Sequence, residues 1–206
     1  MSALTNFYNR FAFFYPLVDI FLKPQKKRFF QEINRLAHGK LLEIGVGNGS
    51  HFHLYQKHQI TGIEISSAML NIAKKHSAGN IELFQMNGEE LAFETESFDY
   101  VVLSHVIAVA QNPDKLILQC HKVLKPEGKL LILNHFTPNN WLKYVDRAFN
   151  LCAGLFQLKS LFYIHNIKDI ERFKPEKEIA LKPLAYFKIL MLVKSWKNTI
   201  GILSRR

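Results

Sequence analysis

Short apolar runs alternate along the chain with longer segments whose apolar residues have helical spacing. The clearest run is Tyr100-Val101-Val102-Leu103, which is typical of a strand buried on both faces of a sheet. The clearest helical spacing is that of Phe29, Ile33 and Leu36. This pattern predicts strands over 40–44, 59–65, 81–85, 98–104 and 129–134, and helices over 25–38, 51–58, 67–76 and 114–124.

The alternation predicts βαβ units, a parallel sheet and an α/β fold. After Pro138 the rhythm changes: 139–165 is a long aromatic and basic segment, which we expect to be helical, and 177–183 and 186–195 resemble two final strands. A chain of 206 residues fits one domain. We divide 1–206 into an aromatic, basic helical lid or membrane-contact segment (1–37), a core (38–138), a helical insertion on the substrate side (139–176) and the final strands (177–206).

Composition narrows the class of protein. Two cysteines, Cys120 and Cys152, do not make a disulfide framework, and each is interpreted as a small buried apolar residue. No Cys/His spacing indicates a metal site. The N-terminus lacks the pattern of a signal peptide, and the apolar stretch 184–193 is too short to span a bilayer. We therefore expect a cytoplasmic protein.

The net charge of +10 is unevenly distributed. Residues 1–40 carry seven Lys/Arg against two Asp/Glu (+5), residues 41–138 seven against ten (−3), and residues 139–206 thirteen against five (+8). Two basic flanks around a mildly acidic centre favour an anionic partner, although an ordinary solvated surface stays open as the alternative.

A glycine loop follows the first predicted strand. Gly45, Gly47 and Gly49 come directly after Glu43, and a helix is expected to begin near Ser50. Glycine is needed where the backbone turns sharply or lies close to a ligand, and the N-terminus of a helix favours an anionic group. The G-x-G-x-G spacing differs from the G-x-G-x-x-G of dinucleotide enzymes.

Glu64 ends the second predicted strand, 19 residues after Gly45. In Rossmann-like folds an acidic side chain at this place accepts hydrogen bonds from ribose hydroxyls. The loop and the acid together predict a nucleoside cofactor, and on these grounds alone either a nicotinamide or S-adenosylmethionine fits.

Several segments in combination decide between these cofactors. Residues 41–49 resemble the first motif of class I S-adenosylmethionine-dependent methyltransferases. Residues 61–70 resemble the second motif of that family, and 87–93 resemble its segment beside the adenine. Residues 97–102 resemble its fourth strand, and 123–129 the turn before its fifth strand. The resemblance covers about 38–136. It implies a Rossmann-like fold with a seven-stranded, mostly parallel sheet, an antiparallel last strand and helices on both faces.

The resemblance also assigns cofactor residues one by one. It implies that Glu43, Gly45, Gly47 and Gly49 lie at the methionine portion of S-adenosylmethionine and that S-adenosylhomocysteine is the product. It further implies that Glu64 accepts hydrogen bonds from the ribose, that Ile65 packs on the adenine and that Asn87 accepts from the adenine amino group. Three more residues are expected to belong to the cofactor site: Gly88, Glu89 and Ser104. Asn87 departs from the Asp often found there, but its carbonyl oxygen can still accept.

A narrower resemblance concerns the acceptor. The segments 105–113, 131–136, 8–11, 15–19 and 183–187 are similar to bacterial phosphatidylethanolamine N-methyltransferases of the soluble, Rhodobacter type. This implies N-methylation of phosphatidylethanolamine toward phosphatidylcholine. Basic, aromatic segments also bind anionic bilayers. We therefore expect a phospholipid substrate, an anionic membrane surface with peripheral attachment to the inner membrane, and no nucleic acid as partner.

An amine acceptor has to lose a proton, so the catalytic candidates are His and Tyr side chains. His105 and His135 follow strands that border the methyl group in this fold, although a role in the core is equally open for each. Tyr8 and Tyr15 are candidates for a lid over the cofactor. The three histidines of the helix predicted over 51–58 are interpreted as structural or exposed: His51, His53 and His58.

Three alternatives remain at this stage. A C- or O-methyltransferase of a quinone or another small hydrophobic acceptor would share the fold. An RNA methyltransferase or nucleic-acid-binding module would account for the net charge, although the aromatic residues lie in apolar stretches. A cofactor-binding protein without activity is disfavoured by the intact glycine loop and Glu64.

Overall fold

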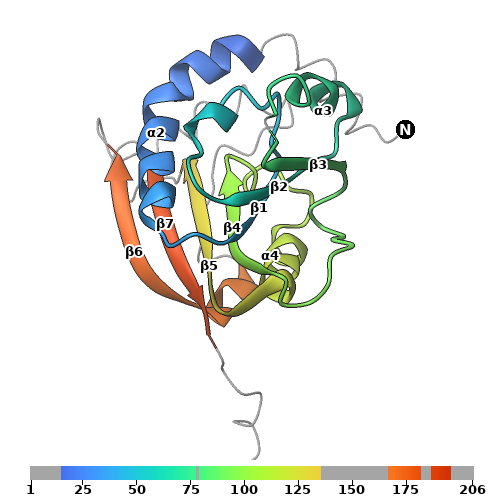
Figure 1. The fold of residues 1–206 in the computed structure, drawn as a ribbon. Coiled ribbons are helices and arrows are strands. Elements are labelled where there is room, and N and C mark those ends of the chain that lie inside the picture. Colours follow the sequence, from blue (N-terminus) through green and yellow to red (C-terminus); the bar gives the residue numbers. More distant parts are fainter. Residues whose placement is uncertain (1–14, 78, 136–166, 182–186, 196–206) are drawn as a thin grey trace, which may run out of the picture.

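A seven-stranded sheet in the order β3-β2-β1-β4-β5-β7-β6 forms the centre of the molecule (Figure 1). The computed structural model describes residues 15–77, 79–135, 167–181 and 187–195, with side chains from residue 24 onward. Within these residues the strands are β1 (Lys40–Ile44), β2 (Gln59–Glu64), β3 (Ile81–Gln85), β4 (Phe98–Ser104), β5 (Leu124–His135), β6 (Phe173–Leu181) and β7 (Phe187–Lys194).

The pairing of the strands confirms the predicted architecture. Strands β1 to β5 pair in parallel, whereas β7 runs antiparallel to both of its neighbours, β5 and β6. The chain builds β1, β2 and β3 in one direction and then returns to place β4 on the other side of β1. Ligands of open α/β sheets bind at such a reversal, beyond the carboxyl ends of the strands.

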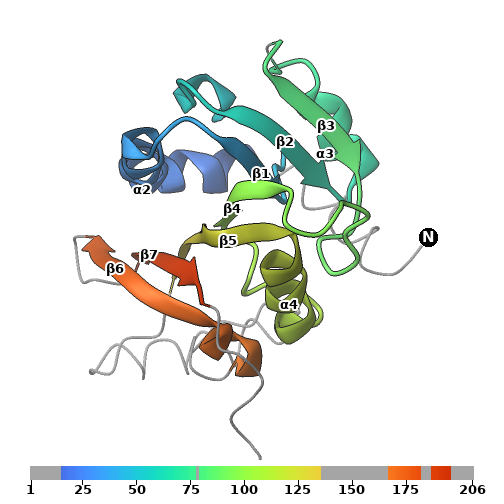
Figure 2. The same ribbon diagram turned by 60° about the horizontal axis from the view of Figure 1, so that its bottom comes forward.

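Helices cover both faces of the sheet, as Figure 2 shows. Helices α2 (Tyr15–Arg35) and α3 (Ser67–Ala73) lie on one face, and α4 (Pro113–Val123) lies on the other. Side chains alternate between these faces along each strand. Leu41 and Leu131 pack toward α2, whereas Leu42 and Leu130 pack toward α4.

Side-chain caps fix where two helices begin. Ser66 accepts a hydrogen bond from the backbone N–H of Met69 (3.3 Å) and is the N-cap of α3. Asn112 accepts from the N–H of Lys115 (3.0 Å), and Pro113 then starts α4.

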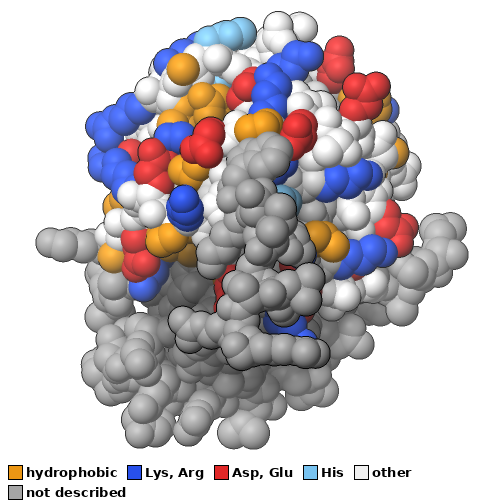
Figure 3. Space-filling view, turned by 90° about the horizontal axis from the view of Figure 1, so that it is seen from below, with side chains coloured by type: hydrophobic (Ala, Val, Ile, Leu, Met, Phe, Trp, Pro, Cys, Tyr) orange, Lys and Arg blue, Asp and Glu red, His pale blue; other side chains and the backbone are white. Residues whose placement is uncertain are grey.

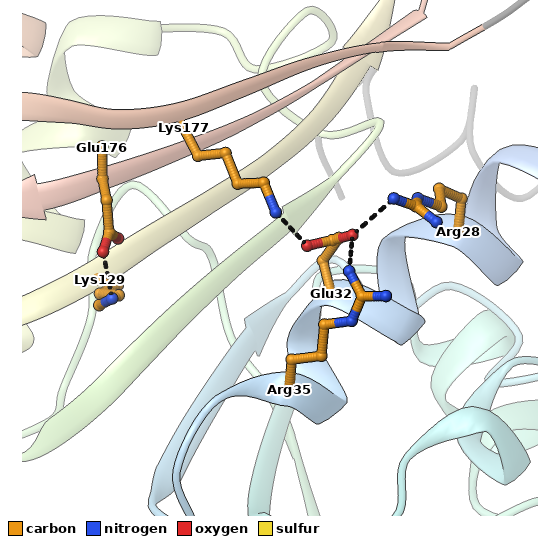
Figure 4. A network of polar contacts seen from close by, with 6 residues as sticks. All are labelled: Arg28, Glu32, Arg35, Lys129, Glu176 and Lys177. Carbon is orange, nitrogen blue, oxygen red and sulfur yellow. Dashed lines mark hydrogen bonds and ion pairs between the residues drawn. The ribbon is translucent and has the colours of Figure 1, made fainter.

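An ion-pair network joins α2 to the edge strand β6 (Figure 4). The Glu32 carboxylate, 2% exposed, contacts Arg28 (3.0 Å) and Arg35 (2.7 Å) on its own helix and Lys177 (2.7 Å) on β6. Burial acts to raise the pKa of Glu32, but the hydrogen bond from Lys177 and the charges of Lys177, Arg35 and Arg28 together hold that pKa below its usual value. A second pair, Lys129 with Glu176, bridges β5 and β6 (2.7 Å).

The predicted helix over 51–58 is wrong. Only a short 3-10 turn, η1 (Phe52–Leu54), forms there, with backbone hydrogen bonds such as that from the Leu54 N–H to the His51 carbonyl (2.9 Å). The two buried aromatic side chains of the segment, Phe52 and Tyr55, are three residues apart and both lie in the core, which suits three residues per turn. Tyr55 is already extended (ψ 140°), so the turn ends there.

Other boundaries also differ from the prediction. Helix α2 begins at Tyr15 and includes Pro24, so it starts before residue 25. Strand β6 begins at Phe173, within the segment expected to be a helical insertion, and follows the 3-10 turn η4 (Lys168–Arg172). The predicted turn over 125–128 is a bulge inside β5, because pairing with β4 passes from Leu124 directly to Lys129. The expected helix over 139–165 lies outside the described residues.

Candidate cofactor and acceptor site

The glycine loop has a backbone that only glycine adopts without strain. Gly45, Gly47 and Gly49 have φ angles of 75°, 58° and 70°. A Cβ on Gly45 would lie 2.5 Å from Cγ2 of Val106, so the loop is packed against the segment after β4. The loop therefore has to be glycine for conformation and for contact.

Glu64 lies at the carboxyl end of β2, beside this loop. It is buried, and its carboxylate accepts hydrogen bonds from the N–H groups of Gly47 (3.0 Å) and Ser66 (2.9 Å). Burial raises the pKa of Glu64, and hydrogen bonds from the N–H groups of Ser66, Gly47 and Ile65 oppose that rise. Because a carboxylate has about four acceptor positions, Glu64 can hold the loop and still accept from ribose hydroxyls.

The segment after β3 lies beside the start of α4. The Asn87 side-chain oxygen accepts from the N–H of Glu89 (3.0 Å), and the Glu89 carboxylate accepts from the N–H of Asn112 (3.0 Å). A Cβ on Gly88 would lie 2.5 Å from Cγ2 of Ile44, so this segment packs on the end of β1. Ile65 is half-buried just after β2. The adenine roles expected for these residues remain predictions.

Glu43 is turned into the protein beneath the loop. Its carboxylate is 1% exposed, accepts a hydrogen bond from the Tyr55 hydroxyl (2.9 Å) and lies 3.0 Å from Nε2 of His51. Its expected place at the methionine portion of the cofactor remains a prediction. The sequence interpretation of His51 as structural agrees with this burial; His58 is buried as well, beside the Ile33 carbonyl (3.2 Å), and His53 is exposed.

Both histidines predicted for the acceptor side contact one aromatic ring. The rings of His105 and Phe187 lie 5.6 Å apart at 84°, and those of His135 and Phe187 lie 6.5 Å apart at 77°. Phe187 stands opposite His135 in the β5–β7 ladder. His105 has a φ of 59°, and its N–H donates to the Leu133 carbonyl (2.8 Å), which turns the chain at the end of β4.

Ser104 precedes this turn. Its hydroxyl oxygen is buried and has no hydrogen-bond partner among the described residues. A buried polar atom without a partner is costly, and a ligand can supply the missing bond. The Ser104 hydroxyl, at the end of the strand between β1 and β5, can therefore form a hydrogen bond with a ligand.

The remaining candidates do not add to the described site. Tyr8 lies outside the described residues, and Tyr15 begins α2 without a described side chain. Burial raises the pKa of the Cys120 thiol far above its usual value, which makes it unreactive. In the part of the chain that the structure describes, no group of three His, Cys, Asp or Glu could hold a metal ion.

Sequence reasoning missed two residues, Tyr55 and Phe187. Tyr55 is four residues after His51, and this spacing would have put both on one face of the expected helix. Phe187 lies in a recognised apolar strand, but only the pairing of β7 with β5 brings it to His105 and His135.

Comparison with known proteins agrees with this geometry. Residues 42–132 match the family described as methyltransferase domain. Among curated relatives, the phosphatidylethanolamine N-methyltransferase of Cereibacter sphaeroides is 26% identical over 92% of this chain and 97% of its own.

Two quinone-pathway enzymes are also similar. The ubiquinone biosynthesis O-methyltransferase of Pseudomonas syringae is 32% identical over 61% of this chain, and the ubiquinone/menaquinone biosynthesis C-methyltransferase of Pseudomonas putida is 30% identical over 73%. The chain spans only 56% and 62% of the length of these two relatives.

Solved structures show the same fold. A chain of the complex between the Haloferax volcanii Trm112 methyltransferase activator and a methyltransferase has a TM-score of 0.73 at 11% identity, covering 91% of this chain and 97% of that one. An S-adenosylmethionine-dependent methyltransferase of Thermotoga maritima has a TM-score of 0.68 at 19% identity, covering 91% and 100%.

The strand order, the left-handed glycine loop and the buried acid after β2 define a Rossmann-like methyltransferase fold. The family match over 42–132 identifies this part of the chain as a methyltransferase domain of the S-adenosylmethionine-dependent type, so its cofactor is S-adenosylmethionine.

Proposed function

We propose that this methyltransferase transfers methyl groups from S-adenosylmethionine to the amine of phosphatidylethanolamine, in the direction of phosphatidylcholine. The observation that carries the proposal is the extent of one match. Similarity to the Cereibacter enzyme continues over 97% of that enzyme, well beyond the domain at 42–132, whereas the chain spans only 56% and 62% of the two quinone-pathway relatives.

The cofactor half of the proposal uses the carboxyl edge of β1 and β2. Gly45, Gly47 and Gly49 let the methionine portion approach the backbone, and the Glu64 carboxylate accepts from the ribose hydroxyls. In this proposal Glu43 lies beneath the loop and Ile65 packs against the adenine. Four further residues complete the cofactor site: Asn87, Gly88, Glu89 and Ser104.

The acceptor half uses the carboxyl edge of β4 and β5 and the start of β7. Methyl transfer from a sulfonium is an in-line displacement, so alignment and exclusion of water contribute most. The amine also has to be deprotonated, for which an imidazole of His105 or His135 is suited. The Phe187 ring beside both is suited to a methylated ammonium, because aromatic faces attract cations.

We further propose that the enzyme acts from the cytoplasm at the surface of an anionic bilayer. No helix among the described residues is long and apolar enough to cross a membrane. The basic balance of residues 1–40 (+5) and 139–206 (+8) favours an anionic surface. On the face seen in Figure 3, acidic and basic side chains are interspersed over the described part, which disfavours that part as the bilayer contact.

The test is transfer of label from methyl-labelled S-adenosylmethionine to vesicles of phosphatidylethanolamine containing an anionic lipid, followed by separation of the lipids. Labelled mono-, di- or trimethylated lipid supports the proposal. A protein that binds the cofactor in calorimetry but labels no lipid contradicts it.

A quinone or another small hydrophobic acceptor is the second candidate. Its support is the 32% and 30% identity to the two quinone-pathway methyltransferases. The same assay with a reduced quinone precursor in place of the lipid separates the candidates, because the labelled product is then a quinol and not a phospholipid.

Attachment to the bilayer has its own test. Sedimentation with vesicles should fall when the anionic lipid is omitted and when salt is raised, since exposed charges are screened beyond about 8 Å at physiological ionic strength. Binding that is the same on neutral and anionic vesicles would contradict the electrostatic part of the proposal.

A further inference from the structure

A buried polar cluster lies directly beneath the glycine loop. It consists of Glu43, His51 and Tyr55, which are 1%, 6% and 8% exposed. The Tyr55 hydroxyl donates to Oε2 of Glu43 (2.9 Å), and Nε2 of His51 lies 3.0 Å from that oxygen and 2.9 Å from Oε1. The Glu43 carboxylate therefore contacts both side chains.

Aromatic packing holds these side chains in place. The His51 ring packs against both Phe30 and Phe52, with ring centroids 5.1 Å away in each case. The Tyr55 ring packs edge-on against Phe30 at 4.7 Å. Since Phe30 belongs to α2, that helix fixes the cluster from outside the sheet.

The protonation of two members follows from their surroundings. Burial, together with the charge and the hydrogen bond of Glu43, raises the pKa of the Tyr55 hydroxyl well above its usual value, so Tyr55 remains a donor. Nδ1 of His51 is buried without a partner among the described residues. A proton on Nδ1 would be left unsatisfied, whereas a proton on Nε2 has Glu43 as its acceptor, so we assign Nε2 as the donor to Glu43.

The cluster closes the base of the loop. Glu43 and His51 flank the segment 44–50, which contains all three glycines with positive φ. Glycines leave a backbone with many accessible conformations, and ordering them on binding weakens affinity. A contact between the two ends of the segment removes much of that freedom before the cofactor arrives.

We infer that His51 and Tyr55 are positioning residues which, through Glu43, hold the glycine loop in its cofactor-binding conformation. The inference rests on the cofactor site given under the proposed function. Neither side chain touches the reacting atoms. Their loss should therefore raise the dissociation constant and the KM for S-adenosylmethionine, while kcat at saturating cofactor and the KM for the acceptor stay the same.

The test is calorimetric titration of S-adenosylmethionine, without acceptor, into the wild type and four variants. Tyr55→Phe removes only the hydroxyl, and His51→Leu removes the donor; each should weaken binding roughly tenfold, since each removes a hydrogen bond to a charged group. His51→Gln retains a side-chain N–H donor and should recover most of the affinity. His53→Leu is the matched control, because His53 is exposed in the same turn, and it should bind as the wild type does.

The outcomes separate this inference from the proposed function. A wild type that fails to bind S-adenosylmethionine contradicts the cofactor site itself. Tyr55→Phe and His51→Leu proteins that melt cooperatively and bind like the wild type overturn the positioning role. So does a loss of kcat at saturating cofactor with unchanged affinity, or a His51→Gln variant as weak as His51→Leu.

Discussion

The two halves of the carboxyl edge of the sheet are built differently. At β1 and β2 the polar groups are already paired within the protein: Glu64 with the N–H groups of Gly47 and Ser66, and Glu43 with His51 and Tyr55. At β4, β5 and β7 the side chains are two imidazoles around one aromatic ring and a buried serine hydroxyl without a described partner. In the proposed function, the first half is the frame that binds the cofactor, and the second half receives the acceptor amine.

This difference separates binding from selection of the acceptor. Residues that act through backbone conformation and buried charge should change cofactor affinity, and residues of the histidine–phenylalanine group should change acceptor kinetics. Variants on the two sides should therefore give different kinetic signatures.

The largest effect is expected for Glu64→Ala. Each ribose hydroxyl would lose a hydrogen bond to a charged acceptor, worth about 1.5–3 kcal/mol, and two such bonds correspond to a loss of cofactor affinity of roughly 100-fold or more. Glu82→Ala on the exposed side of β3 is the matched control. Unchanged affinity in calorimetry would show that the ribose assignment is wrong.

The pH dependence of the wild type sharpens this assignment. Because burial raises the pKa of Glu64, a carboxylate that must be ionised to accept from the ribose becomes protonated at a pH above the usual 4.5. Cofactor affinity should therefore weaken on acidification before ordinary glutamates titrate. For the protein without cofactor the sign is opposite: a raised pKa means that protonating Glu64 favours the folded state.

Gly45→Ala is expected to have the next largest effect. A residue with a Cβ at φ 75° is strained by about 1–2 kcal/mol, and Val106 would also have to move, since its Cγ2 lies 2.5 Å from the added atom. The melting temperature and the cofactor affinity should both fall, the latter about tenfold. Gly79→Ala, where no atom lies within 4 Å of an added Cβ, serves as control.

Phe187→Leu should affect only the acceptor half. Loss of an aromatic face beside a cationic headgroup corresponds to about 0.5–2 kcal/mol. The KM for methylated lipid intermediates should therefore rise several-fold and the final methylation should slow, with unchanged cofactor affinity. Phe187→Tyr keeps the ring and should behave like the wild type; equal product ratios in all three proteins would exclude a role for the ring.

The smallest effect is expected from Lys177→Met, which belongs to neither half. Arg28 and Arg35 would still pair with Glu32, so thermal unfolding should show a loss of roughly 0.5–1 kcal/mol near neutral pH. Because the pKa of Glu32 is lower in the folded than in the unfolded protein, its ion pairs stabilise the fold at a pH above the pKa of the unfolded state. This stability is lost as the pH falls through the pKa of the folded state. The wild type and the variant should therefore converge in acid. Lys129→Met should lower the free energy of unfolding by less, because the partner of Lys129, Glu176, is exposed.

The sequence predicted most of the fold because the information is local. Alternating runs and helical spacing located the five parallel strands. The glycine loop and Glu64 do lie together at the carboxyl ends of β1 and β2, and their cofactor roles remain predictions. The helix over 51–58 was wrong because the three-residue spacing of Phe52 and Tyr55 fits a single 3-10 turn as well as an α-helix, and the chain is already extended at Tyr55.

The contacts of Phe187 could not be predicted, because the insertion of β7 between β5 and β6 places it next to His105, far away in the chain. The contacts of Glu43 are local, since His51 and Tyr55 follow it by 8 and 12 residues. Only the ring of Phe30 on α2, which packs beside His51, comes from a separate element.

The ion pair between Glu32 and Lys177 joins residues 145 positions apart. Contacts of such sequence separation form late, because the intervening chain has to be ordered first. During synthesis, α2 emerges early but acquires this partner only after β6 has been made. Until then Glu32 has only its two arginines as charged partners, so α2 is translated first but acquires its link to β6 last.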